Sequence, residues 1–267
     1  MPQWTIRFIR AIVKRMKNTQ KKELAVCGLN AVKALAAVHG DKIRRLYFTQ
    51  DRKFDFGEIC KQMAARKAPY NMVEAGDLEK LCGSVHHQGV VAMMEEPRIV
   101  TLNSDITDEW LHRKESAILL DRVGNANNLG AIVRSAAFFG FKHIIIPLDE
   151  AQSSITTSSY RVAQGGMEYV HIYCVHSMVR LLQAMKGKMV RIGTDVAADK
   201  PIGAIGSLRG GKPVLIVLGN EENGIAKDVR QHCDYMVTIP HGAGERQLES
   251  LNVAQASAII LYECSRS

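Results

Sequence analysis

The amino-acid sequence predicts an α/β protein of two domains, the larger of which contains a mostly parallel sheet. Strand-like and helix-like segments alternate along most of the 267 residues. The run 117–120 is apolar at every position, which is typical of a strand buried on both faces. Polar turns containing glycine or asparagine lie next to the apolar runs near the carboxyl terminus. Open α/β sheets bind small molecules at such turns, so the sequence predicts a binding site there.

Composition narrows the class of protein before any motif is considered. Hydrophobic residues make up 46% of the chain, enough for a sizeable core. A net charge of +8 and a pI of about 9.2 favour an anionic partner such as nucleic acid, although a merely basic protein is an alternative. The six cysteines show no C-x-x-C spacing, so neither a metal site nor a disulfide framework is predicted. No apolar stretch approaches the roughly 18 residues that span a bilayer, and we expect a soluble, cytoplasmic protein without membrane contact.

The first 22 residues differ from the rest of the chain. They contain no acidic residue, and apolar side chains recur at helical spacing, which predicts a basic amphipathic helix. Three interpretations stay open: an RNA-contacting arm, a helix that docks on its own domain, and an organellar transit peptide. The cations of this segment are Arg7, Arg10, Lys14, Arg15, Lys17, Lys21 and Lys22.

A small α/β domain is predicted over residues 23–97. Helices are expected over 28–38, 54–67 and 76–82, and strands over 43–49, 70–74 and 89–94. Gly40 is expected to end the first helix as its C-cap. Basic residues recur in this region, and for each of them an RNA surface and a solvated charged face are equally good interpretations. Residues 98–116 have the composition of a linker with one helical turn near Trp110.

The second domain is predicted over residues 117–267. Its strands are expected over 117–120, 143–146, 170–175, 189–194, 214–218 and 236–239. Helices are expected over 131–139, 177–186, 225–231 and 253–263, and a polar turn over 121–130. This order predicts a parallel sheet covered by helices on both faces.

Three polar clusters in this domain suggest chemistry, although each has a structural explanation by itself. The pattern Gly219-x-Glu221-x-x-Gly224 lacks the Gly-Lys-Ser/Thr ending of a P-loop, and no G-x-G-x-x-G occurs in the first strand–turn–helix unit. These absences disfavour a nucleoside triphosphate or a dinucleotide. Taken singly, Gly219 is a turn residue, Asn252 a helix N-cap and Arg134 a surface charge. Their joint order within one α/β domain favours a shared site.

The joint pattern resembles a known family. Asn128-x-Gly130-Ala131-Ile132-x-Arg134, Gly219-x-Glu221-x-x-Gly224 with Ile239-Pro240, and Ser250-Leu251-Asn252-Val253 are similar to the three motifs of the SpoU (TrmH-like) RNA ribose methyltransferases of the SPOUT superfamily. This resemblance covers residues 117–263. Residues 24–96, with the closing run His87-Gln88-Gly89-Val90-Val91, resemble the L30e-like substrate-binding domain of the same family.

The resemblance implies a fold, a cofactor and partners. We expect a SPOUT α/β domain with a deep trefoil knot, a rare exception to unknotted topology, preceded by the L30e-like domain. The family further implies a homodimer through the C-terminal domain, with S-adenosylmethionine bound in the knot. By position, Gly219, Ile239 and Leu251 would contact this cofactor, with Leu218 and His241 adjacent. Arg134, Glu221, Ser250 and Asn252 would form the catalytic surroundings, and Asn128 would shape the turn before Arg134.

The implied reaction is methylation of a ribose 2′-hydroxyl, which selects RNA over DNA and leaves transfer and ribosomal RNA as alternatives. Because a guanidinium stays protonated, we interpret Arg134 as a fork that binds a phosphate and stabilises charge on the 2′-oxygen. The sequence departs from the family pattern at Asn125-Ala126, Ser135, His241 and Ala254, and the loop 241–249 is long. A catalytically inactive RNA-binding protein that retains the fold is therefore the alternative.

Overall fold

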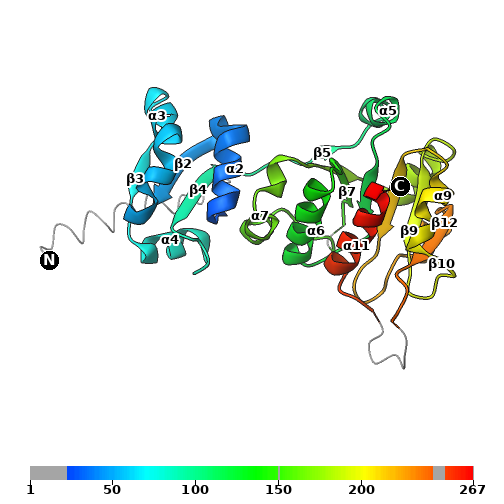
Figure 1. Ribbon diagram of the computed structural model, residues 1–267. Helices are drawn as coiled ribbons and strands as arrows, with labels where there is room; N and C mark the ends of the chain where they lie inside the picture. The colour runs from blue at the N-terminus through cyan, green and yellow to red at the C-terminus, as the bar shows by residue number, and fades with distance from the viewer. Residues whose placement is uncertain (1–22, 150, 243–249, 267) are drawn as a thin grey trace, which may run out of the picture. The chain divides into compact units, whose positions relative to one another are not determined.

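The computed structural model describes residues 23–149, 151–242 and 250–266 (Figure 1). These residues form two compact units, which are described separately. The first unit contains residues 23–98 and a later segment, Thr156–Glu168. The second unit contains Ile99–Ile155 and the chain from Tyr169 onward. The basic segment 1–22 and most of the loop that follows His241 were singled out in the sequence, and both lie outside the described residues.

The first unit is built on a mixed sheet of four strands. Its order is β1-β4-β2-β3, with β1 and β2 antiparallel to the central β4, and β3 parallel to β2. No strand is predicted at β1, because residues 24–27 are a short apolar run without alternation. The strands are β1 (Glu23–Cys27), β2 (Ile43–Phe48), β3 (Tyr70–Met72) and β4 (Val90–Glu95).

The helices of the first unit correct one local prediction and confirm another. The helix expected over 54–67 begins only at Gly57, because the residues before it form the 3₁₀ turn η2 (Gln50–Phe56). Gly40 is the C-cap of the first helix, as predicted, with a right-handed φ of −56°, and the chain continues into the 3₁₀ turn η1 (Gly40–Lys42). The α-helices of residues 23–98 are α2 (Leu29–His39), α3 (Gly57–Ala65) and α4 (Ala75–Cys82).

The segment Thr156–Glu168 packs with the first unit although it lies within the sequence range expected for the second domain. It contains α7 (Thr157–Ala163) and the 3₁₀ turn η3 (Gly166–Glu168). Asn30 Nδ2 donates to Gln164 Oε1 at 3.1 Å, and His39 Nδ1 lies 2.6 Å from Glu168 Oε2. These contacts, between residues more than a hundred positions apart, follow no periodic pattern that a sequence could reveal.

The second unit contains an eight-stranded sheet in which every pairing is parallel. Its order is β10-β12-β9-β11-β6-β7-β8-β5. The predicted α/β class with a parallel sheet is confirmed, whereas the trefoil knot stays a prediction. The strands are β5 (Val100–Thr101), β6 (Ala117–Leu120), β7 (His143–Pro147), β8 (His171–Val175), β9 (Val190–Thr194), β10 (Lys200–Pro201), β11 (Val214–Leu218) and β12 (Tyr235–Thr238).

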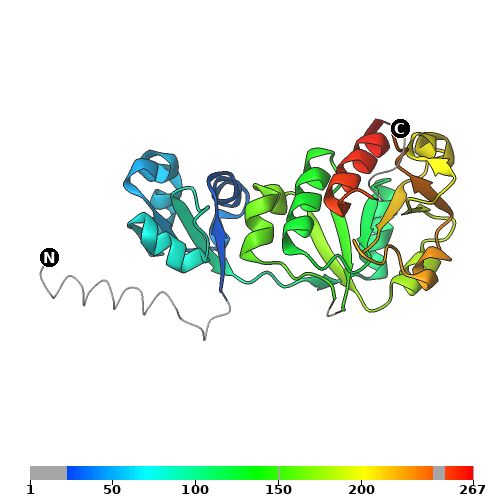
Figure 2. The same cartoon turned by 90° about the horizontal axis from the view of Figure 1, so that it is seen from below.

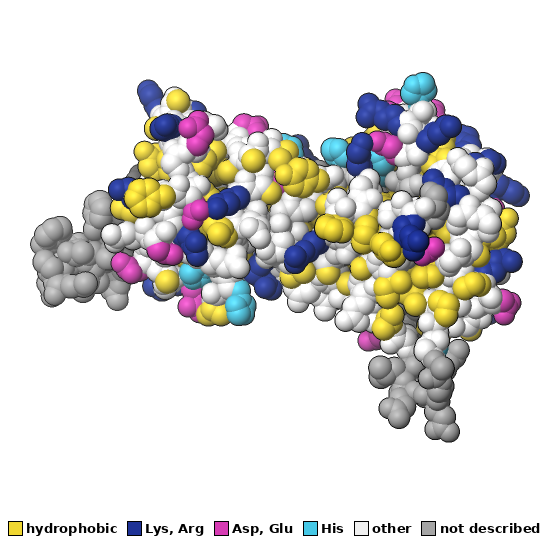
Figure 3. All heavy atoms as spheres, viewed as in Figure 1, with side chains coloured by type: hydrophobic (Ala, Val, Ile, Leu, Met, Phe, Trp, Pro, Cys, Tyr) yellow, Lys and Arg dark blue, Asp and Glu magenta, His cyan; other side chains and the backbone are white. Residues whose placement is uncertain are grey.

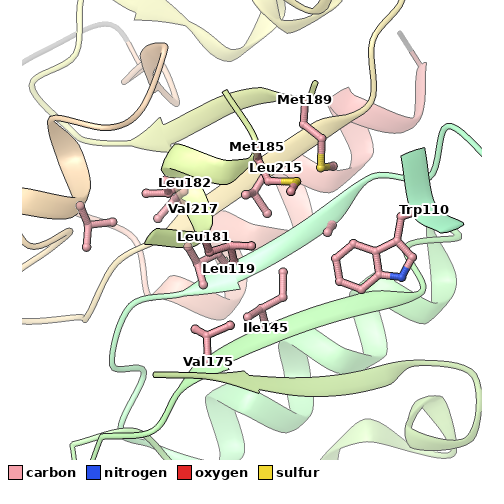
Figure 4. Packing of buried hydrophobic residues seen from close by; sticks show 12 residues of the cluster. Trp110, Leu119, Ile145, Val175, Leu181, Leu182, Met185, Met189, Leu215 and Val217 are labelled. Carbon is pink, nitrogen blue, oxygen red and sulfur yellow. The ribbon is translucent and has the colours of Figure 1, made fainter. Parts of the chain in front are cut away.

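Helices pack on both faces of this sheet. Leu119, Ile145 and Val217 point toward one face and pack against side chains from α5 (Ser104–His112), α8 (Met178–Ala184) and α10 (Lys227–Arg230) (Figure 4). The alternate side chains of the same strands point to the other face, where α6 (Ala126–Phe138) and α11 (Val253–Arg266) lie side by side (Figures 1 and 2). A sixth, short helix, α9 (Ile205–Arg209), contacts α11.

Of the stretch expected to be a linker, 98–116, residues 99–116 are part of the second unit. They supply the edge strand β5 and all of α5. Trp110 on α5 is 2% exposed and stacks on the ring of His143, with 4.3 Å between ring centroids. The many polar residues of this stretch lie on the outer side of an amphipathic helix, which explains why its composition resembles that of a linker.

An ion pair between a buried arginine and a partly exposed aspartate joins β9 to the turn before β12. Arg191 is 4% exposed, and its Nε donates to Asp234 Oδ2 at 2.9 Å, while its Nη1 donates to the carbonyl oxygen of Leu182 at 3.0 Å. The hydrogen bond from Arg191 lowers the pKa of Asp234 below its usual value. The stabilisation by this pair is therefore complete above the unfolded-state pKa of about 3.9 and is lost as the pH falls through the lower folded-state pKa.

We expect Asp234→Asn to lower the free energy of unfolding by about 1–3 kcal/mol at neutral pH, because it leaves a buried guanidinium without its partner charge. The difference from wild type should shrink toward zero as the pH falls below about 3.9. Urea titrations across this range measure it. Glu58→Gln, which removes the exposed partner of Lys61, is the control and should change the free energy by less than about 0.5 kcal/mol. A difference that does not depend on pH would contradict this account of the pair.

Candidate active site

The carboxyl ends of four parallel strands of the second unit lie along one edge of its sheet. Leu218 at the end of β11 is in register with Leu120 at the end of β6. On the other side of β11, Thr194 at the end of β9 is in register with Val237 of β12. The turns that follow these strands therefore lie along the same edge, where open α/β sheets place their sites.

Asn128 lies in the first turn of α6, not in the loop before it. This helix is predicted over 131–139, and in the structure it begins at Ala126. The cause is a local cap: Asn125 Oδ1 accepts a hydrogen bond from the backbone N–H of Asn127 at 2.8 Å. Asn128 therefore has the fixed direction of a helical side chain.

The amide of Asn128 connects the three sequence motifs. Its Nδ2 donates to Glu221 Oε1, and its Oδ1 accepts a hydrogen bond from Asn252 Nδ2 at 3.2 Å. The three residues lie on different segments of the chain, 93 and 124 positions away from Asn128. We call Asn128, Glu221 and Asn252 the amide cluster. Its existence shows that the polar turns singled out in the sequence meet at one place.

Asn252 has two functions within the fold. Its Oδ1 accepts from the backbone N–H of Ala254 at 2.9 Å, so the N-cap predicted for the helix that becomes α11 is confirmed. Its Nδ2 is directed to Asn128 instead. The cap and the amide cluster thus use different atoms of one side chain. Ser250 and Leu251, directly before it, are exposed.

Glu221 is held by a tight turn that requires glycine. Asn220 and Gly224 exchange two backbone hydrogen bonds of 3.1 and 2.9 Å, which close the turn. A Cβ atom on Gly219 would lie 2.3 Å from the carbonyl carbon of Gly224, so any side chain there would force the turn open. Gly224 has a φ of 64°, in the left-handed region. The turn therefore fixes the direction in which Glu221 leaves the sheet edge.

A fully buried aspartate, Asp121, holds the start of the loop between β6 and α6, and the sequence analysis does not single it out. Its Oδ1 accepts from Arg122 Nε at 2.6 Å, and its Oδ2 accepts from the backbone N–H of Ala226 at 2.6 Å. Its position directly after a buried strand is a signal that could have indicated it.

The same loop is held by two further side chains that the sequence does not reveal. Gln152 Oε1 accepts from the backbone N–H of Val123 at 3.0 Å, and its Nε2 donates to the carbonyl oxygen of Val123 at 3.0 Å. Asn220 Nδ2 donates to the carbonyl oxygen of Arg122 at 2.8 Å. Together these bonds set where α6 begins, and hence where Asn128 lies.

Arg134 is exposed on α6, outside the amide cluster. It follows Asn128 by six residues, which on a helix places it about 9 Å along the axis and about 120° around it. Within the described part of the chain, no hydrogen bond or ion pair joins Arg134 to another side chain. It shares a face of α6 with Phe138, four residues later.

The residues expected to bind the cofactor lie at or after the strand ends of the same edge. Leu218 is buried at the end of β11, and Ile239 follows β12 two strands away, a span of about 10 Å. Leu251 is 46% exposed, and His241 is exposed. Apolar side chains open to solvent beside a rigid glycine turn fit an adenosine group, which is bound by apolar contacts and backbone atoms. In the described part of the chain, no group of three or more His, Cys, Asp or Glu residues could hold a metal ion.

Two family models match this chain. Residues 115–262 match the SpoU rRNA Methylase family, and residues 25–100 match the RNA 2′-O ribose methyltransferase substrate-binding domain. The chain belongs to the SpoU rRNA methylase family. Membership confirms the class of enzyme predicted from the three motifs, an RNA ribose 2′-O-methyltransferase, and its cofactor, S-adenosylmethionine.

Curated relatives and solved structures agree with this assignment. A 23S rRNA (guanosine-2′-O-)-methyltransferase RlmB from Pseudomonas aeruginosa is 28% identical over 90% of this chain and 95% of its own length. An uncharacterized tRNA/rRNA methyltransferase from Haemophilus influenzae is 32% identical over 60% of this chain, which spans only 44% of that relative. The SpoU methyltransferase AviRb from Streptomyces viridochromogenes has a TM-score of 0.69 and 25% identity, covering 94% of this chain and 91% of its own. The AdoMet-bound rRNA methyltransferase from Sinorhizobium meliloti, at 21% identity, has a TM-score of 0.71 over 98% of this chain and 94% of its own, and is similar in fold.

The helices of the described chain include none that is long and apolar enough to cross a membrane.

Proposed function

We propose that this protein methylates a ribose 2′-hydroxyl of RNA at the amide cluster, with ribosomal RNA as the first substrate to test. The observation that carries the proposal is the pair of hydrogen bonds at Asn128, which donates to Glu221 and accepts from Asn252, so that three motifs of the family meet. The guanosine-2′-O-methyltransferases among its relatives, which match nearly the whole chain, support ribosomal RNA. We place the reaction in the cytoplasm because that is where such RNA is processed in bacteria.

The cofactor would be held beside the amide cluster. Gly219, Ile239 and Leu251 would contact the cofactor. Leu218, buried directly before Gly219, and the exposed His241 would lie next to it. When bound, S-adenosylmethionine supplies a methyl group on a sulfonium sulfur. The protein must bring a ribose hydroxyl into line with that group, and alignment alone can lower a barrier by several kcal/mol.

The amide cluster is suited to position the hydroxyl. Asn128 occupies one oxygen of the Glu221 carboxylate, which leaves the other oxygen to accept a hydrogen bond from the ribose 2′-hydroxyl. Ser250, exposed and two residues from Asn252, can donate to or accept from the same ribose. Arg134 would bind the adjacent phosphate through its planar fork and stabilise the negative charge that develops on the 2′-oxygen.

A homodimer through the C-terminal domain is part of the proposal. Hydrophobic side chains are exposed on the face of the second unit that carries α6 and α11 (Figure 3). Phe138 is 82% exposed, and a row of rings runs from it through Phe139 to Tyr262, with centroids 5.1 and 6.0 Å apart. Exposed apolar patches of this kind mark interaction sites. Because Arg134 shares a face of α6 with Phe138, a dimer formed here would place Arg134 at the interface, where it could serve the partner's amide cluster.

We expect Phe138→Glu to weaken self-association about 30-fold or more, because a charge would replace a central aromatic contact. Sedimentation velocity across a range of protein concentrations measures the change. Tyr169→Glu, which alters another exposed ring of the second unit (57% exposed), is the matched control and should leave self-association unchanged. A Phe138→Glu variant that sediments like wild type would show that the interface lies elsewhere.

The proposed activity is tested with isotope-labelled S-adenosylmethionine. The purified chain is incubated with unmodified ribosomal RNA and, separately, with transfer RNA, and the digested nucleosides are identified by mass spectrometry. The proposal predicts a labelled 2′-O-methylnucleoside. Calorimetry that detects no binding of S-adenosylmethionine, together with retained RNA binding, would favour the inactive RNA-binding protein instead.

A further inference from the structure

Phe54 is an unusually exposed ring on the first unit. At 93% exposure it is the most exposed large hydrophobic side chain among the described residues. Two positions later, Phe56 is 2% exposed and packs against Phe48, with ring centroids 6.1 Å apart. Folding therefore buries one ring of η2 and leaves the other in water. Single exposed hydrophobic residues are common, so exposure by itself does not indicate a binding site.

The loop that carries Phe54 is fixed on both sides. Before the ring, the backbone N–H of Thr49 donates to the carbonyl oxygen of Gly89 at 2.9 Å, and Arg52 Nε donates to the carbonyl oxygen of Gln88 at 3.2 Å. After the ring, Phe56 is anchored in the core. A Cβ on Gly89 would lie 2.6 Å from Thr49 Oγ1, which shows how closely the two loops approach. A ring held on such a frame loses little conformational entropy when it binds a partner.

The charges around Phe54 favour an anionic partner. Lys33 Nζ lies 2.6 Å from Asp55 Oδ1, and this bond lowers the pKa of Asp55. Arg52 lies 3.4 Å from Asp51 and 3.6 Å from Asp55, so both acidic residues that flank the ring are paired with cations. Lys53, directly before Phe54, is exposed and forms no hydrogen bond or ion pair with any residue that the structure describes.

We propose that Phe54 is a stacking platform for an unpaired RNA base and that Lys53 contacts the adjoining phosphate. Every base offers a π-face, so such a platform selects single-stranded RNA and not a particular sequence. Within a duplex, the faces are covered by neighbouring base pairs. The RNA partner is taken from the proposed function, and the family model that matches residues 25–100 describes substrate binding. Phe54 would thus distinguish unpaired from paired nucleotides of the RNA substrate.

The test uses the full chain and two probes, a single-stranded oligoadenylate of about 12 nucleotides and an RNA duplex of the same length. Affinity is measured by fluorescence anisotropy at several salt concentrations. Phe54→Ala should weaken binding of the single strand roughly 5- to 100-fold and change duplex binding less than about 2-fold. Its salt dependence should stay that of wild type, because no charge is lost. Lys53→Ala should instead reduce the salt slope by about 0.7 on the single strand.

Two further variants make the result specific. Phe54→Trp should retain affinity, and the fluorescence of its new indole should be quenched when oligoadenylate binds. Val85→Ala, which trims another exposed hydrophobic residue of the same unit (62% exposed), should bind both probes like wild type. Equal losses on both probes, or no loss for Phe54→Ala, would overturn the proposal. So would weaker self-association of Phe54→Ala, since the ring would then contact a second copy of the chain.

The result of the binding test on Phe54 is independent of the result of the methyl-transfer test. Binding of oligoadenylate is measured without the cofactor, so it reports on Phe54 whether or not the chain transfers methyl groups. A wild-type chain that binds the single strand through Phe54 yet transfers no methyl group would overturn the proposed activity alone.

Discussion

Replacing Arg134 with alanine is expected to lower the rate of methyl transfer about 100- to 1,000-fold, the scale observed when one electrostatic stabiliser is removed. Folding and cofactor binding should stay close to wild type, because Arg134 is exposed and has no bonding partner within the described chain. Single-turnover transfer to bound RNA measures the effect without interference from product release. Arg134→Lys should recover only part of the rate, since an ammonium lacks the planar fork that binds a phosphate.

The matched control is Arg180→Ala, which removes another exposed arginine, this one on α8. An arginine that is only a surface charge should change the free energy of unfolding by no more than about 0.5 kcal/mol and leave the rate unchanged. Arg180→Ala should behave in this way. If Arg134→Ala also transfers methyl groups at the wild-type rate, Arg134 has no part in the reaction.

Asn128→Asp is expected to reduce the rate about 100-fold. The substitution replaces the Nδ2 donor with a second carboxylate beside Glu221, so the hydrogen bond is lost and like charges repel. Displacement of Glu221 by about 1 Å would be enough for a loss of this size. The free energy of unfolding should fall as well, since the amide cluster connects three segments. Rates at saturating RNA and cofactor, together with urea titrations, measure both effects.

Asn125→Asp is the control with the same chemical change three residues earlier. Its side chain caps α6, and aspartate caps a helix as well as asparagine does. The added negative charge at the helix N-terminus is mildly favourable. This variant should therefore keep its stability and most of its activity. Equal losses for both variants would mean that charge near α6, not the contact with Glu221, determines the rate.

Local patterns were sufficient to predict much of the fold. The run Ala117–Leu120 is fully buried in a parallel sheet, as continuous apolar character indicates. The stretch 98–116 was wrongly predicted to be a linker, because the polar outer face of α5 has the composition of a linker. The packing of Thr156–Glu168 with the first unit could not be predicted, since it depends on contacts such as Asn30 with Gln164 between distant segments.

The candidate site, like the fold, could be predicted from the sequence only in part. The meeting of Asn128, Glu221 and Asn252 follows from their places at strand ends and helix starts, and the motifs identified all three. Their mutual bonds, however, depend on where α6 begins, which the Asn125 cap determines. Gln152 was missed because its amide bonds only backbone atoms, those of Val123 and Ser153, and such contacts leave no signature in the sequence.

The most direct test of the central claim is the chemical position of the transferred methyl group. Once the modified nucleotide has been mapped in ribosomal RNA, two synthetic substrates are compared, one with ribose and one with 2′-deoxyribose at that nucleotide. The account predicts transfer to the first, giving a phosphodiester that resists alkaline hydrolysis, and no transfer to the second. Equal methylation of both substrates would place the methyl group on the base and would contradict the function proposed for the amide cluster.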